Sequence, residues 1–180
     1  MPRAMQAVVL VPHPATPSAA VRSIFVRVRR EGRALALDYR LSGDVPRLRL
    51  PQPAPAARAE GLWRHTCFEL FVAARGAPAY QEFDFSPSGE WAAYAFAAYR
   101  EDAAPLECRS PALARRESAK ELALQASVGC AARGPLRLGL SAVVEDAEGA
   151  LSYWALLHRS AKPDFHDAAS FALELDEARH

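Results

Sequence analysis

The sequence has little cysteine and almost no methionine. Its three cysteines, Cys67, Cys108 and Cys130, are odd in number and show no CxxC spacing. This argues against a disulfide framework and against a cysteine-rich zinc site. Because Cys67 lies within an apolar strand pattern, we expect an inert buried thiol there rather than a reactive one.

Charge of one sign and long apolar runs are also missing. The chain has 22 basic and 21 acidic residues and a net charge of +1, which gives no general attraction to nucleic acid or to an acidic membrane surface. No stretch approaches the roughly 18 apolar residues of a membrane span. The apolar run at residues 7–11 is too short for a signal-peptide core and is followed by Pro12. We therefore expect a cytoplasmic protein that binds neither nucleic acid nor membrane, with its oligomeric state left open.

Standard catalytic signatures are absent as well. The sequence contains no GxSxG, HExxH, GxxxxGK[ST] or GxGxxG motif, which argues against the common enzyme classes that these motifs mark. The absence favours a non-catalytic protein and leaves a less common enzyme open.

Apolar residues at every second position are what the sequence has instead. Ile24, Val26 and Val28 precede a turn at Glu31 and Gly32, and residues 35–41 then repeat the alternation. This pattern predicts a β-hairpin with one face turned inward. Further strand-like runs lie at residues 66–73, 80–86, 90–99, 122–128, 136–144, 151–157 and 171–175.

Two segments lack this alternation. Residues 51–60 form a proline- and alanine-rich loop, and residues 101–118 are expected to be an irregular crossing loop with one helical turn near 111–116. Nine or ten short strands without a long helical pattern predict an all-β fold, a two-sheet antiparallel β-sandwich of jelly-roll type. We expect one domain over residues 1–180, with its core at about 20–175.

Acidic side chains recur on the strands between residues 63 and 99. Alternation places His65 and Glu69 on one strand face, and Glu82 and Asp84 together on a face of the next strand. Glu69 fits a structural ion pair, or equally an acceptor for sugar hydroxyls or a metal ligand. Glu82 and Asp84 fit a cation or hydroxyl site, or a solvated face.

A second polar group follows the run at 151–157. His158, Lys162, Asp164 and His166 lie within nine residues, in a loop that Pro163 stiffens. Such a loop beside aromatic strands is where a binding site is expected, although Asp164 and His166 could instead cap a turn. A zinc or iron site is conceivable from His65, His158, His166 and Glu69, but nothing in the spacing brings these ligands together.

Two motifs carry a family resemblance. The order W-x-x-T-x-F-E-x-F, from Trp63, followed by Y-x-E-F-x-F-S-P-S-G-E-W, from Tyr80, resembles the DOMON-like and family 9 carbohydrate-binding module superfamily. The match is closest to small stand-alone bacterial DOMON-like proteins, in which an ending of the type Y-W-A-L-x-H followed by P-D-F-H also looks characteristic. The resemblance extends over residues 20–175, with the flanks matched by strand pattern only.

The resemblance implies a β-sandwich that binds either sugars or haem. Sugar-binding members hold a ring between aromatic side chains, and the candidates here are Trp63, Trp91, Trp154 and Tyr80. Trp63 ends a loop and is the expected exposed platform, whereas the alanines around Trp91 favour a place in the core. Haem-binding members are implied to use a methionine with a histidine or lysine as axial ligands. Because the only methionines are Met1 and Met5, we expect no haem held in that manner and no other cofactor, and a bis-histidine arrangement is the alternative.

We therefore expect a non-catalytic domain that binds a saccharide or glycoconjugate. The predicted binding residues are Trp63, His65, Glu69, Tyr80, Glu82, Asp84, Trp91, His158, Lys162, Asp164 and His166. A metal- or carboxylate-assisted hydrolase using the same polar cluster is the first alternative. A protein-interaction module without a small-molecule site is the second.

Overall fold

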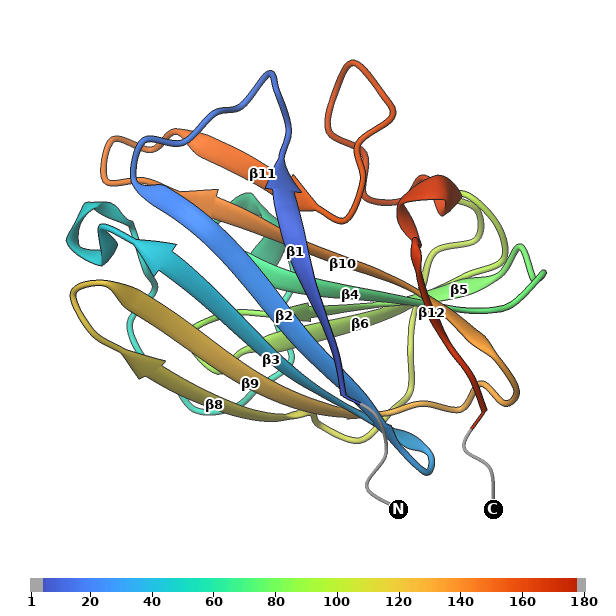
Figure 1. Ribbon diagram of the computed structural model, residues 1–180. Coiled ribbons are helices and arrows are strands. Elements are labelled where there is room, and N and C mark those ends of the chain that lie inside the picture. The colour runs from blue at the N-terminus through green and yellow to red at the C-terminus, as the bar shows by residue number, and fades with distance from the viewer. Residues whose placement is uncertain (1–4, 178–180) are drawn as a thin grey trace.

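The computed structural model describes residues 5–177, which form β-strands joined by loops and short 3-10 helices (Figure 1). In this part of the chain the twelve strands are β1 (Gln6–Pro12), β2 (Val21–Glu31), β3 (Ala34–Gly43), β4 (Cys67–Ala74), β5 (Tyr80–Phe85), β6 (Trp91–Phe96), β7 (Ala104–Pro105), β8 (Ala112–Glu117), β9 (Glu121–Gly129), β10 (Leu136–Glu145), β11 (Leu151–Ala155) and β12 (Leu173–Leu175). The 3-10 helices span Val45–Arg47, Leu62–Arg64 and Ala168–Ser170. The prediction of an all-β fold is confirmed.

No helix among residues 5–177 is long and apolar enough to cross a membrane. Met1, one of the two methionines considered for haem, lies outside the described residues.

The hairpin predicted from residues 24–41 is formed by β2 and β3. Ile24, Val26 and Val28 are buried, and the two strands pair antiparallel up to Glu31 and Ala34. Gly32 has a φ of 60° in the two-residue turn, a conformation that glycine adopts without the steric cost of a Cβ atom. Local sequence therefore determines both the turn and the inward face.

All twelve strands belong to one continuous antiparallel sheet. Its order is β7-β6-β5-β4-β10-β11-β1-β2-β3-β9-β8, and β12 pairs separately with β10. β1 joins the two halves because its first five residues pair with β2 and its last two pair with β11. The sheet curls so that β2, β3 and β9 lie over the green strands β4, β5 and β6 in Figure 1.

The prediction of nine or ten strands in two sheets was wrong, because residues 5–177 form twelve strands in one continuous sheet. Three strands were missed, β1, β7 and β8, and β1 makes the sheet continuous. The helical turn expected near 111–116 is wrong, because β8 pairs with β9 over six residues. Most of its side chains are exposed, so this edge strand carries no apolar alternation that would reveal it.

The two faces of β4 and β5 have different neighbours. Phe68 and Phe85 face inward, where the Tyr39 ring lies 5.0 Å and 6.4 Å from theirs. This inner face belongs to the main apolar core between the halves of the curled sheet. The outer face carries a smaller apolar cluster, with Phe71, Tyr80 and Phe171 buried in it, and the acidic side chains of the candidate site.

Candidate functional site

The site begins with three carboxyl groups on the outer face of β4 and β5. Glu69 lies directly opposite Asp84, and Glu82 opposite Phe71. Although their residue types favour water, Glu69, Glu82 and Asp84 are only 2%, 6% and 0% exposed. The interpretation of Glu82 and Asp84 as part of a solvated face was therefore wrong.

Burial changes the protonation of these groups. It raises the pKa of Glu69, with a further increase from nearby Glu82, and raises the pKa of Asp84, with further increases from both glutamates. Burial also raises the pKa of Glu82, against opposing effects of Asp84 and Arg100. The Ser141 hydroxyl donates to Glu69 Oε2 at 3.2 Å. These three side chains, Glu69, Glu82 and Asp84, form the floor of the candidate site. Their carboxyl groups resist ionisation, because a charge there lacks compensating solvent.

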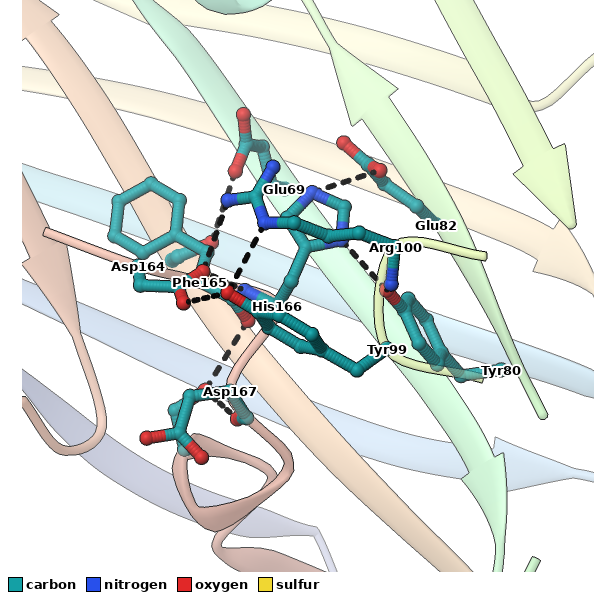
Figure 2. A network of polar contacts seen from close by, with 11 residues as sticks. Glu69, Tyr80, Glu82, Tyr99, Arg100, Asp164, Phe165, His166 and Asp167 are labelled. Carbon is teal, nitrogen blue, oxygen red and sulfur yellow. Dashed lines mark hydrogen bonds and ion pairs between the residues drawn. The ribbon is translucent and has the colours of Figure 1, made fainter. Parts of the chain in front are cut away.

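His166 lies next to these carboxyl groups, and both of its ring nitrogens face side chains of β5 (Figure 2). Its Nδ1 is 2.7 Å from the Tyr80 hydroxyl, and its Nε2 is 3.5 Å from Glu82 Oε2. The ring packs against Phe71 and Phe96, with centroids 5.1 Å away in each case. Burial, reinforced by Arg100, lowers the pKa of His166 to about 4, so the imidazole is neutral at pH 7 and offers one donor and one acceptor.

An ion pair holds the loop that carries His166. Arg100 donates to Asp164 Oδ1 at 2.9 Å, and the Tyr99 hydroxyl donates to Asp164 Oδ2 at 2.6 Å (Figure 2). Against the effect of burial, the hydrogen bonds from Tyr99 and Arg100 lower the pKa of Asp164. Asp164 Oδ1 also accepts the amide of His166 at 3.1 Å. Asp164 is thus both the turn cap and the anchor of the loop.

These groups border a cleft of about 790 Å³. Its charged and polar lining comprises Glu60, Arg64, Glu69, Glu82, Arg100 and His166, and its aromatic lining comprises Trp63, Tyr94, Phe96, Tyr153 and Phe165. Trp63 is 49% exposed, and the Arg64 guanidinium lies 5.3 Å from its ring centroid. Gly61, with a φ of 70°, precedes the 3-10 helix Leu62–Arg64 that presents Trp63.

Seven of the eleven predicted binding residues are brought together here. Trp63, Glu69, Glu82 and His166 line the cleft. Tyr80, Asp84 and Asp164 lie behind them, where Tyr80 contacts His166, Asp84 pairs with Glu69 across the strands, and Asp164 fixes the loop.

The other four lie elsewhere. His65 Nδ1 is 2.7 Å from Glu145, which also binds Arg49. Trp91 is 6% exposed and lies under Arg58, and His158 contacts the Val11 carbonyl at 2.8 Å. Lys162 is exposed beside Pro163, which does line the cleft.

The metal site considered from His65, His158, His166 and Glu69 does not form. Among residues 5–177, the one group of three or more side chains with metal-ligand geometry is Cys67, Glu69 and Asp84. Cys67 is buried, as expected for an inert thiol. Its charged neighbours are all acidic, whereas Cys108 and Cys130 each lie near arginines.

Sequence reasoning missed Tyr99 and Arg100. Arg100 also donates its backbone amide to the Tyr80 hydroxyl at 3.1 Å, and it has a φ of 53°, which is uncommon for a residue with a side chain. The sequence shows Arg100 directly after the aromatic residues of β6. No local pattern links it to its partner Asp164, which is 64 residues away.

No protein-family model matches the chain, and no curated protein matches its sequence. Solved structures do share its fold. A candidate carbohydrate-binding protein from Bacteroides uniformis ATCC 8492 superposes with a TM-score of 0.69 and 16% identity, over 97% of this chain and 86% of that one.

Two structures of a family 9 carbohydrate-binding module from Caldicellulosiruptor kristjanssonii are also similar. The complex with cellotriose has a TM-score of 0.53 and 8% identity, over 87% of this chain and 75% of that one. The complex with glucose has a TM-score of 0.52 and 9% identity, over 88% and 78%. The chain therefore has a fold like that of family 9 carbohydrate-binding modules.

Proposed function

We propose that the protein binds a small saccharide, or the saccharide part of a glycoconjugate, in the cleft between Trp63 and His166. The observation that carries this proposal is the lining of the cleft, where an exposed tryptophan and further aromatic rings accompany buried hydrogen-bonding groups. A volume of about 790 Å³ falls within the roughly 300–1,000 Å³ of small-molecule sites.

Trp63 supports the proposal through its shape and exposure. A sugar ring has apolar C–H faces that pack on an aromatic surface, and tryptophan provides the largest such surface. Because Trp63 is 49% exposed, it can cover a ring without prior unfolding of the core. Arg64 lies over the same side chain and can donate to hydroxyl groups at the ring edge.

The floor supplies complementary polar groups. Sugar hydroxyls are both donors and acceptors, so they suit neutral partners that also have both functions. His166 is neutral at pH 7 because its pKa is lowered to about 4, and since its Nδ1 is engaged by the Tyr80 hydroxyl, Nε2 is the ring atom left for a sugar hydroxyl. Burial raises the pKa of neighbouring Glu82 toward the neutral acid, which can both donate and accept. Binding through these groups needs neither a cofactor nor a bond-breaking step.

The structures of similar fold support the same ligand class. Two of them hold cellotriose and glucose, which makes glucose and its β-linked oligomers the first probes. The DOMON-like relationship implied by the sequence motifs belongs to this proposal too, since sugar binding is one of the two activities that it implies.

Isothermal titration with glucose, cellotriose and then a broad glycan panel tests the proposal. Trp63→Ala should weaken binding by about 2 kcal/mol, or about 30-fold. Phe25→Ala is the matched control, because Phe25 is an exposed aromatic residue at 47% and is not part of the cleft lining. If no glycan binds, or if both variants weaken binding equally, the proposal is wrong.

A further inference from the structure

Three potential metal ligands converge at the floor of the cleft. The Sγ atom of Cys67 and a carboxylate oxygen from each of Glu69 and Asp84 all lie within 4.8 Å of one another. The sheet register explains this, since Cys67 and Glu69 are two residues apart on β4 and Asp84 is directly opposite Glu69 on β5. Residues at positions i and i+2 of a strand share a face with the cross-strand partner.

Asp84 provides an independent observation. Its side chain is 0% exposed, and neither carboxylate oxygen has a hydrogen-bond partner of good geometry among the described residues. The neighbouring Glu82 carboxyl group, which interacts with Asp84 more loosely, is itself acidic. Buried polar side chains nearly always have such a partner, because desolvation without one is costly. Both oxygens of Asp84 therefore remain available to a ligand in a place that excludes bulk water.

The other two side chains also have free coordinating capacity. Ser141 donates to one oxygen of Glu69 at 3.2 Å, which orients the carboxyl group and leaves its second oxygen. The Cys67 thiol makes a long contact of 3.6 Å to the Phe68 carbonyl and a backbone hydrogen bond with Phe85, and its sulfur keeps lone pairs for a metal ion. Ser141 thus has the place of an outer-shell partner, which commonly orients a metal ligand.

We propose that Cys67, Glu69 and Asp84 bind a divalent transition-metal ion of the Zn²⁺ type. Thiolate and carboxylate ligands together suit Zn²⁺ and Co²⁺, whereas Ca²⁺ and Mg²⁺ prefer oxygen ligands alone. Three protein ligands leave a fourth position, as in open zinc sites. Glu69 also lines the cleft, so an ion that enters from the cleft meets this ligand first.

Metal binding at this site releases protons to the solvent. Coordination requires the thiolate and the carboxylates, and each proton that the ion displaces passes to water. Affinity should therefore increase with pH.

Titration of the chelator-treated 180-residue chain with Co²⁺, and then with Zn²⁺ in competition, tests the site. We expect one ion per chain, with a thiolate-to-cobalt charge-transfer absorption that Zn²⁺ abolishes. Cys67→Ser should remove this absorption and weaken Zn²⁺ binding by about 100-fold or more, because even an outer-shell change costs about 10–100-fold. Cys130→Ser is the matched control, since Cys130 is also buried but has arginines as its charged neighbours.

A second variant covers the case in which Cys67→Ser folds poorly. Asp84→Asn keeps the shape of the side chain and should weaken Zn²⁺ binding while circular dichroism shows an unchanged fold. An unchanged affinity in Asp84→Asn, a charge-transfer band that persists in Cys67→Ser, or no metal uptake at all would overturn the proposal. Trp63→Ala should leave metal binding unchanged, so this result is independent of saccharide binding.

Discussion

The two faces of β4 and β5 are equally buried but differ in how they are covered. The inner face presents Phe68, Leu70 and Phe83 to the apolar core between the halves of the curled sheet. The outer face presents Glu69, Glu82 and Asp84 beneath the cleft. One strand pair therefore supplies a stable core on one side and a polar floor on the other.

This difference shows how the fold can carry costly polar groups. Burial of apolar area on the inner face contributes about 25 cal/mol per Å², whereas the outer carboxyl groups oppose folding when they are ionised. The outer cover consists mainly of loops, held together by contacts such as Arg100 to Asp164. The apolar core and the candidate binding site thus lie on separate faces of the same strand pair.

The largest expected effect comes from truncation of one phenylalanine on each face. Phe68→Ala should lower the free energy of unfolding by about 3–5 kcal/mol, because it leaves a cavity in a closely packed core. Phe71→Ala should cost less, since its neighbours Phe165 and His166 come from a loop that can relax. Urea denaturation measures both values.

Equal losses of unfolding free energy in Phe68→Ala and Phe71→Ala would contradict the proposed difference between the two faces. They would mean that the outer cover is packed as firmly as the core. An exposed variant, Phe25→Ala, serves as the reference for loss of an aromatic side chain without a cavity.

The strands that pack against the inner face of β4 and β5 could be predicted from sequence, because the alternation of apolar residues alone identifies them. β2, β3 and β9 each have a clear apolar period of two. β1 was not identified, since its short apolar run ends at Pro12 and its pairing with β11 joins residues more than 140 positions apart. The continuity of the sheet depends on that one long-range contact, which no local pattern encodes.

The outer face was predicted only in part. Alternation correctly placed Glu82 and Asp84 on one side of a strand, but their burial depends on loops from distant parts of the chain. Alternation also predicted that His65 shares a strand face with Glu69. However, β4 begins only at Cys67, so the alternation does not extend back to His65, which contacts Glu145 instead. Polar loop residues are difficult to predict because their partners are set by tertiary structure.

His166 should make the stability of the protein depend on pH. The pKa of His166 is lowered from 6.5 to about 4 by burial and by Arg100, so the unfolded chain binds a proton at a pH where the folded chain does not. Stability should therefore fall as pH decreases from about 6.5 to 4, by about 3 kcal/mol in total. Denaturation at several pH values should show this loss in the wild type and not in His166→Gln. If both proteins lose stability equally, His166 is not the group responsible.

Asp84 should have the opposite pH dependence. Burial raises its folded pKa above the unfolded value, so the folded state holds more protons and stability is lost as pH rises through that interval. Between pH 4 and pH 8, without added metal, Asp84→Asn should gain about 1–3 kcal/mol relative to the wild type. The same denaturation series measures this gain, and Asp38→Asn is the control for a carboxylate that is only partly buried and pairs with Arg40. A constant difference across the series would show that Asp84 does not titrate within it.

The smallest effect on stability is expected where the proposed effect on binding is largest. Trp63 is half exposed on the 3-10 helix Leu62–Arg64, so Trp63→Ala should change the free energy of unfolding by only about 0.5 kcal/mol. Denaturation and glycan titration of the same preparation separate the two quantities. A loss of several kcal/mol would mean that Trp63 anchors the cover and that weaker sugar binding reflects a disturbed cleft. A small loss with weakened binding would instead show that the outer face keeps an aromatic surface whose main role is contact with a ligand.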